Sequence, residues 1–187
     1  MRIIAGKYKS RKIFSGLKES VQASKSSFRP TTDRAKESLF NTLNNILDFD
    51  SVTCLDLFAG SGSLGFEAIS RGGASCEFVD NSVNQVKLIM QTAEHLGISD
   101  QITVNRSDVT DFLTSNREAS YDLVLADPPY SYEKYDILLQ KVFDLNFGIF
   151  VLEHPGTCNL MYDTNRFNEI NKVIGFTNFK IFSTKDE

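Results

Sequence analysis

Asp127, Pro128, Pro129 and Tyr130 directly follow an apolar stretch, residues 121–126. Proline removes a backbone donor and pushes the preceding residue toward extended geometry, so Asp127 is held stiffly at the end of a predicted strand. The amine of a nucleobase is a poor nucleophile because its lone pair is delocalised. The Asp127 carboxylate and the Pro128 carbonyl could accept its two hydrogens, and Tyr130 could stack on the base for about 1–3 kcal/mol. This stretch favours methylation of a base amine, provided that a methyl donor binds beside it.

A glycine-rich turn follows another predicted strand, and it satisfies the spacing Gly60-x-Gly62-x-x-Gly65. Glycines let the backbone turn sharply toward a ligand and lead into a helix start with unpaired N–H groups. Asp80 lies near the spacing expected for an acid that binds a ribose. The pattern fits NAD, FAD or S-adenosylmethionine, which all contain adenosine. A structural turn without a ligand is the alternative.

Asp80 and Asp108 each end a predicted strand, and each allows two interpretations. Asp80 could bind a ribose or cap the following helix. Asp108 could accept a hydrogen bond from an adenine amino group or act as a helix N-cap, with Asp111 three residues later. Beside the glycine turn, we favour the ligand for both.

Strands and helices alternate along most of the chain, which predicts a parallel, doubly wound α/β sheet. Ligands of such sheets bind beyond the carboxyl ends of the strands, where these motifs fall. The predicted strands are 52–58, 74–80, 101–106, 121–126 and 148–153, with an antiparallel hairpin at 172–183 turning near Gly175. The predicted helices begin at Thr32 or Asp33 (apolar positions Ala35, Leu39, Leu43, Ile46 and Leu47), at Leu64, at Asn81 or Ser82 (Val83, Val86, Met90, Ala93 and Leu96 inward, ending at Gly97) and at Tyr135.

The charge is distributed unevenly along the chain. Residues 1–36 contain ten Lys and Arg and two acids, a net +8, whereas the other 151 residues contain ten basic and 22 acidic residues, a net −12. Residues 2–14 predict a small basic β-hairpin. A basic segment on an acidic body favours an arm that binds a polyanion, with a solvated tail as the alternative. Its candidate RNA-binding side chains are Lys7, Lys9, Arg11 and Lys12.

The composition indicates a cytoplasmic protein that does not contact a membrane. No apolar run approaches the ~18–20 residues needed to span a bilayer, and the charged amino terminus does not resemble a signal peptide. The three cysteines form no CxxC pair, and Cys54 and Cys76 lie in apolar segments, which predicts buried free thiols and no metal site. His154 is expected to be structural rather than a general base.

The sequence resembles a known family along nearly its whole length. LDLFAGSGSLGFEAISRGG, FVD at 78–80 and LADPPY look like a class I S-adenosylmethionine-dependent amino-methyltransferase. MRIIAGKYKSRKI, FRPTTDRAKESLFN and VLEH at 151–154 narrow the likeness to RsmD-type 16S ribosomal RNA guanine-N2 methyltransferases. The chain departs from the family at Ile174-Gly175, where a tyrosine-glycine is expected.

The resemblance implies a Rossmann-like seven-stranded sheet with an antiparallel last strand, and a basic arm of residues 1–30 on a methyltransferase domain of residues 31–187. It implies S-adenosylmethionine as the donor, S-adenosylhomocysteine as the product, no metal, and 16S rRNA within a small subunit or an assembly intermediate as the partner. The donor would be bound by Asp56, Phe58, Ala59, Gly60, Gly62, Asp80, Asn81, Asp108, Val109 and Asp127. Asp127, Pro128 and Tyr130 would position the guanine amine, and Arg29, Thr31 and Arg34 would lie near the RNA.

Other activities stay open at this point. A DNA or RNA adenine-N6 methyltransferase uses similar Asp-Pro-Pro-Tyr chemistry, although a DNA enzyme usually needs a recognition domain for which this chain has little room. A nicotinamide dehydrogenase would explain the glycine turn but neither Asp127–Tyr130 nor the basic segment. A non-catalytic RNA-binding factor for ribosome assembly would not need the intact Asp127–Tyr130 motif.

Overall fold

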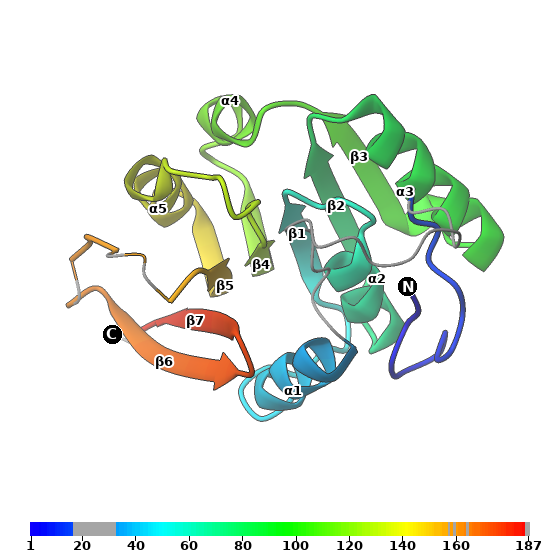
Figure 1. The fold of residues 1–187 in the computed structure, drawn as a ribbon, viewed down its shortest axis with the longest axis horizontal. Helices are drawn as coiled ribbons and strands as arrows, with labels where there is room; N and C mark the ends of the chain where they lie inside the picture. Colours follow the sequence, from blue (N-terminus) through cyan, green and yellow to red (C-terminus); the bar gives the residue numbers. More distant parts are fainter. Residues whose placement is uncertain (17–32, 157, 159, 164, 186–187) are drawn as a thin grey trace.

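The structure is a computed structural model, and it describes residues 1–16, 33–156, 158, 160–163 and 165–185. Seven strands form one sheet in the order β3-β2-β1-β4-β5-β7-β6 (Figure 1). Strands β1 to β5 are parallel, and β7 runs antiparallel to both of its neighbours, β5 and β6. The strands are β1 (Thr53–Leu57), β2 (Ser75–Asp80), β3 (Ile102–Arg106), β4 (Ser120–Ala126), β5 (Asn146–His154), β6 (Phe167–Ile174) and β7 (Thr177–Thr184). The predicted doubly wound sheet with an antiparallel last strand is confirmed.

Helices cover both faces of the sheet, because neighbouring strand residues point to opposite faces. Leu123 and Leu125 of β4 pack in a core with the amino-terminal segment, α1, α2 and α3. Val124 and Ala126 of the same strand pack in a second core with α4 and α5. The helices are α1 (Asp33–Leu43), α2 (Ser63–Ser70), α3 (Val83–Leu96), α4 (Val109–Ser115) and α5 (Tyr135–Phe143), with a short 3₁₀ helix η1 (Ser99–Gln101).

The amino-terminal segment, which we define as residues 1–16, folds back through a turn and pairs with itself, as the predicted hairpin requires. The amides of Ile3 and Ile13 donate to carbonyls of the facing half at 3.0 and 2.9 Å, and within the described residues the pairing amounts to one antiparallel bridge, Arg2 to Lys12, rather than two full strands. Ile3 and Ile13 are fully buried in the core of the domain. The segment runs beside α2 and α3 (Figure 1), and its contacts with those helices, described below, add to its own backbone hydrogen bonds. The predicted boundary between residues 30 and 31 lies outside the described residues.

Two of the predicted helical faces were partly wrong. Helix α1 ends at Leu43, so Ile46 lies beyond it and is 43% exposed, whereas Leu47 packs on the core. In α3 the buried residues are Ile89, Thr92 and Ala93, while Val83 and Met90 are exposed. The apolar pattern alone placed Met90 inward, but this helix covers the sheet with a narrower stripe that includes a threonine, whose hydroxyl is satisfied by the Leu88 carbonyl.

Other local predictions are confirmed. Ser82 caps α3, Gly97 ends it in a left-handed conformation, and Gly175 turns the β6–β7 hairpin at φ 62°. Cys54 and Cys76 are buried free thiols. Within the described residues, no helix has the length and apolar character that crossing a membrane requires.

Candidate active site

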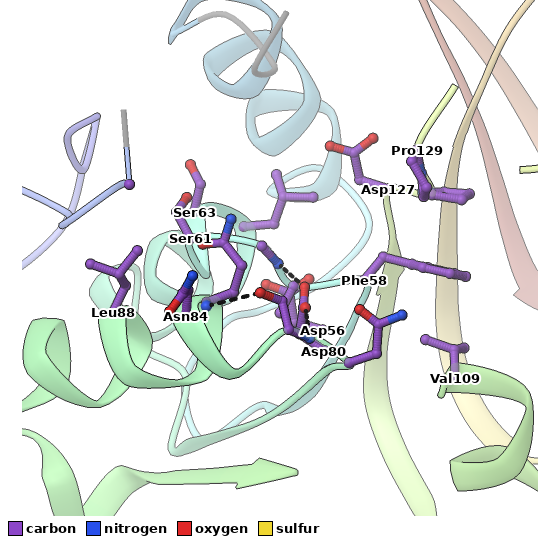
Figure 2. Close-up of a pocket in the computed structure, with 18 of the residues that line it drawn as sticks. Asp56, Phe58, Ser61, Ser63, Asp80, Asn84, Leu88, Val109, Asp127 and Pro129 are labelled. Atoms are coloured by element: carbon purple, nitrogen blue, oxygen red, sulfur yellow. Dashed lines mark hydrogen bonds between the residues drawn. The ribbon is translucent and has the colours of Figure 1, made fainter. Parts of the chain in front are cut away.

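A cavity of about 860 Å³ lies at the carboxyl ends of β1, β2 and β4. Such a volume falls in the range of small-molecule sites. In Figure 2, Asp56 and Asp80 lie in the middle of the cavity, Asp127 and Pro129 on one side, and Leu88 on the opposite side. Of the donor-binding residues predicted from the sequence, all but Gly62 line this cavity: Asp56, Phe58, Ala59, Gly60, Asp80, Asn81, Asp108, Val109 and Asp127. Pro128 and Tyr130, which were predicted to position the base, line it as well.

Two glycines of the turn have structural roles in α2. Gly62 is the N-cap of α2 and does not line the cavity. Gly65 has a packing role, since a Cβ there would lie 2.6 Å from the Cys76 sulfur of β2. The third glycine of the motif therefore lets α2 pack tightly on the sheet.

Asp56 connects the end of β1 to the first turn of α2. One of its oxygens accepts a hydrogen bond from the Gly65 amide at 2.8 Å, and its side chain is only 2% exposed. Burial raises the pKa of Asp56 well above its usual range, although the Gly65 N–H opposes this, and the charges of Asp127 and Asp80 raise it further. The site therefore favours the neutral form of Asp56, and a cationic ligand beside it would stabilise the charged carboxylate and lower this pKa.

Asp80 and Asp108 both accept backbone hydrogen bonds, but only Asp108 is the N-cap of the helix that follows it. Asp80 accepts hydrogen bonds from the amides of Gly60 and Ser82, each at 2.8 Å. Asp108 is the N-cap of α4 and accepts from the amide and hydroxyl of Thr110; the hydroxyl is the largest cause of the lowered pKa of Asp108. The capping interpretation is thus confirmed for Asp108. Because both acids also line the cavity, their ligand roles stay predictions.

The Asp127–Tyr130 stretch leaves the sheet as an irregular turn. Asp127 is half-buried and Pro128 buried, whereas Tyr130 is 54% exposed. The Pro129 carbonyl accepts a hydrogen bond from the Tyr132 amide at 2.7 Å, which closes the turn. Asp127 is thus fixed at the cavity wall with an accessible aromatic ring beyond it, as the sequence indicates.

The ionisable side chains that line the cavity are all acidic or phenolic. Four carboxylates line it, those of Asp56, Asp80, Asp108 and Asp127, and among its described lining residues there is no lysine, arginine or histidine. A low-dielectric cleft lined by one sign of charge attracts the opposite sign. The cavity therefore favours a cation and disfavours a diphosphate.

Two cavity residues present buried polar atoms that have no hydrogen-bond partner within the described structure. They are the Oε1 atom of Gln85, in the first turn of α3, and the hydroxyl of Tyr132. Burial of a polar atom is costly without a partner, so a ligand with donors and acceptors would satisfy them. Tyr132 packs edge-on against Phe58 with ring centroids 5.0 Å apart, and burial raises its pKa to about 12, so its hydroxyl stays protonated.

Sequence reasoning missed several residues of this cavity. Asn84, Gln85 and Leu88 share one face of α3, and their helical spacing after Asp80 could have indicated them. Tyr132 follows the Asp127–Tyr130 stretch by two residues and could have been found as well. Met1, Ser15 and Gly16 also line the cavity, and no local signal points to them.

The predicted RNA-binding side chains lie around the amino-terminal part. Lys7, Lys9, Arg11 and Lys12 are all exposed. Arg34 is an exposed residue in the first turn of α1, whereas Arg29 and Thr31 lie outside the described residues.

His154 is absent from the described cavity lining, and its Nδ1 lies 3.0 Å from the Pro155 carbonyl oxygen. No group of three or more His, Cys, Asp or Glu side chains that could hold a metal ion occurs within the described ranges.

Comparisons with known sequences agree on one family. The family model described as Conserved hypothetical protein 95 matches residues 1–182. Ribosomal RNA small subunit methyltransferase D of Haemophilus influenzae is 39% identical over 136 residues, 71% of this chain and 65% of that protein. Its namesake in Escherichia coli K12 is 37% identical over 132 residues, 70% of this chain and 60% of that protein. The match therefore spans less than two thirds of either relative.

The Bacillus subtilis protein YlbH is matched over more of its length. It is 35% identical over 160 residues, which is 82% of each chain. Among solved structures, yhhF of Escherichia coli superposes with a TM-score of 0.81 at 24% identity and covers 100% of this chain and 99% of its own. HI0767 of Haemophilus influenzae gives 0.75 at 23% identity and covers 99% and 98%. These two structures share the fold.

Proposed function

The chain belongs to the RsmD-type family described as Conserved hypothetical protein 95, and from this we propose that it methylates the N2 amine of a guanine in 16S rRNA. The donor would be S-adenosylmethionine and the product S-adenosylhomocysteine. Two relatives carry the name ribosomal RNA small subunit methyltransferase D, which supports rRNA of the small subunit as the substrate class. The substrate would be a small subunit or an assembly intermediate in the cytoplasm.

The charge of the cavity carries this proposal. Four carboxylates line it, and no lysine, arginine or histidine does so within the described residues. S-adenosylmethionine carries a sulfonium and an ammonium group beside a single carboxylate, a net positive charge, whereas NAD carries a diphosphate that the carboxylates of the cavity would repel. Asp127 also lines this cavity, and a nicotinamide dehydrogenase would not need the Asp127–Tyr130 motif. Charge and motif together favour a methyl donor over a nicotinamide.

The residues present fit this donor. Asp80 and Asn81 line the cavity where β2 ends and would bind the ribose hydroxyls, while Asp56 and the Phe58–Gly60 turn would face the methionine end. The orphaned Gln85 Oε1 and Tyr132 hydroxyl supply polar partners. When bound, S-adenosylmethionine supplies an electrophilic methyl group on a positively charged sulfur.

The chain itself would contribute positioning more than acid–base chemistry. The target guanine must leave its stack to reach the cavity, and Tyr130, exposed at the rim, would stack on it. Asp127 and the Pro128 carbonyl would each accept one hydrogen of the amine, so that the nitrogen lone pair points into the cavity. The amine gains one methyl group and loses one proton, which Asp127 can accept and pass to water.

Tritiated methyl transfer tests the proposal. The purified chain is incubated with labelled S-adenosylmethionine and, in parallel, naked 16S rRNA, immature small subunits and DNA, and the labelled base is then identified. We expect label in N2-methylguanine of rRNA. Label in N6-methyladenine would favour the alternative chemistry, and no label on any substrate would favour a non-catalytic RNA-binding factor. Calorimetry that finds NAD binding tighter than S-adenosylhomocysteine would contradict the donor.

A further inference from the structure

The amino-terminal segment forms part of the wall of the donor cavity. Met1, Ser15 and Gly16 line the cavity, so both ends of the segment reach it. The Ser61 hydroxyl, in the glycine turn, lies 3.6 Å from the Met1 sulfur. Gly16 lies beside Leu88 of α3, which also lines the cavity. The segment is therefore part of the donor site as well as a carrier of basic side chains.

A fully buried carboxylate holds this segment on the domain. Glu67 of α2 accepts hydrogen bonds from the amides of Ile4 at 2.8 Å and Ala5 at 3.0 Å. One turn further, the Ser70 carbonyl accepts from the Lys7 amide at 2.7 Å, and the Ser70 hydroxyl accepts from the Tyr8 amide at 3.0 Å. Side chains and a carbonyl of α2 thus accept hydrogen bonds from four amides of the segment.

A buried lysine connects this contact to the cavity. The Lys36 ammonium, on α1, is 1% exposed and donates to the Arg2 carbonyl at 2.8 Å and to the Ser63 hydroxyl at 2.9 Å. It also lies 3.6 Å from the Glu67 carboxylate. Ser63 is the first residue of α2 and lines the cavity. The lysine therefore joins the segment, the buried acid and the glycine turn in one network.

We propose that Glu67 and Lys36 are positioning residues that hold the amino-terminal segment against the donor cavity, so that the position of this segment sets donor affinity. The inference rests on the proposed donor. The same segment exposes Lys7, Lys9, Arg11 and Lys12 to solvent. RNA that binds these side chains would hold the segment in place, and donor and RNA would then each increase the affinity of the other by the same factor.

Gly6 offers a test that changes no charge and no cavity residue. A Cβ at Gly6 would overlap the Ser70 carbonyl, and φ is +80°. Gly6→Ala should therefore displace the segment from α2. Gly97→Ala is the matched control, because Gly97 also has a positive φ, +71°, but nothing lies within 4 Å of its added Cβ. Backbone strain is common to both variants, and only Gly6→Ala creates the overlap.

The readouts are calorimetric affinity for S-adenosylhomocysteine and amide hydrogen exchange. If Gly6→Ala leaves the segment in place in about a tenth of the molecules, the apparent Kd rises roughly tenfold. Gly97→Ala should bind within about twofold of wild type. In the wild-type protein, S-adenosylhomocysteine should slow exchange at the Ile4 and Ala5 amides, which a purely structural network would not do. This second measurement stands even if Gly6→Ala does not fold.

Glu67→Gln provides a conservative check, because the amide keeps one acceptor but removes the charge that pairs with Arg71 Nε at 2.9 Å and with Lys36 Nζ at 3.6 Å. It should weaken donor binding by less than Gly6→Ala does. Unchanged affinity in Gly6→Ala, with no donor-dependent protection at Ile4 and Ala5, would overturn the inference and leave the proposed function intact. Failure of the wild-type protein to bind S-adenosylhomocysteine would instead refute the proposed donor.

Discussion

The Asp80 carboxylate holds the glycine turn and the start of α3 together. Its two oxygens accept hydrogen bonds from the Gly60 amide and the Ser82 amide, each at 2.8 Å. A donor that contacts Asp80 would therefore meet a side chain already fixed by two backbone groups. This arrangement reduces the entropy that binding must remove, which is the usual benefit of a preformed site.

Asp80→Ala should weaken donor binding, because it removes the predicted contact to the ribose and the two hydrogen bonds that fix the Gly60 and Ser82 amides. A hydrogen bond to a charged group contributes about 1.5–3 kcal/mol, so we expect a roughly 10- to 100-fold rise in the Kd for S-adenosylhomocysteine, measured by calorimetry. RNA binding should change little. Asp100→Ala is the control, because Asp100 is exposed in η1 just before β3, at the opposite end of the strands, and does not line the cavity. Wild-type affinity in Asp80→Ala would remove this residue from the site.

Asp127→Ala should abolish most methyl transfer while it preserves the fold and donor binding. The carboxylate would act on the base amine, and a misplaced reactive group costs on the order of 100-fold in rate. Single-turnover kinetics at saturating RNA would measure this loss. Asp136→Ala, which removes an exposed acid of α5, is the control. Single-turnover rates within a few-fold of wild type would show that Asp127 lacks this role.

Tyr130 should contribute through its ring rather than its hydroxyl. Tyr130→Ala would lose a stacking contact worth about 1–3 kcal/mol, a loss of roughly 5- to 150-fold in kcat/KM for RNA. Tyr130→Phe keeps the ring and should retain most of the activity. Equal losses in the two variants would mean that the hydroxyl, and not stacking, is what matters.

The exposed lysines and arginine of the amino-terminal segment should bind RNA phosphates. Each phosphate contact contributes about 0.7–0.9 to the slope of log K against log salt, so replacing Lys7, Lys9, Arg11 and Lys12 with serine should flatten it by about 2–3, if most of the four touch phosphate. RNA binding measured at several salt concentrations gives the slope.

Donor affinity should stay unchanged in that quadruple variant, which distinguishes it from Gly6→Ala. The control replaces Lys141 of α5 and Lys185, just after β7, with serine, because neither lies in the amino-terminal segment or lines the cavity. An unchanged slope in the quadruple variant would return the four residues to the alternative of a solvated segment.

The sequence predicted the fold well wherever the determining signal is local. Strand, glycine turn and helix follow each other within a few residues from Thr53 onward, and that alternation predicts the parallel part of the sheet. The strand ends also brought Asp56, Asp80 and Asp127 to one cavity, because parallel strands meet at one edge. Their roles in binding and catalysis stay predictions.

Features that depend on distant partners could not be predicted in this way. The amino-terminal residues form the predicted turn with one antiparallel bridge, but the amides of Ile4 and Tyr8 bind Glu67 and Ser70, more than sixty residues away. Nothing in the local pattern of Ile4 or Ala5 indicates a carboxylate partner. The prediction that Met90 points inward was wrong for a related reason, because which residues of α3 are buried depends on the neighbouring helix and the amino-terminal segment.

The long separation between the amino-terminal segment and its partners also bears on the order in which the protein forms during synthesis. The Ile4 amide donates to the carboxylate of Glu67, 63 residues further along, and the Phe14 amide donates to the hydroxyl of Thr92, 78 residues further along. The ribosome releases the segment first, so Ile3 and Ile13 leave it before the helices that bury them exist. A nascent chain that has not yet emerged as far as Tyr132, the last residue that lines the cavity, would therefore lack a complete site.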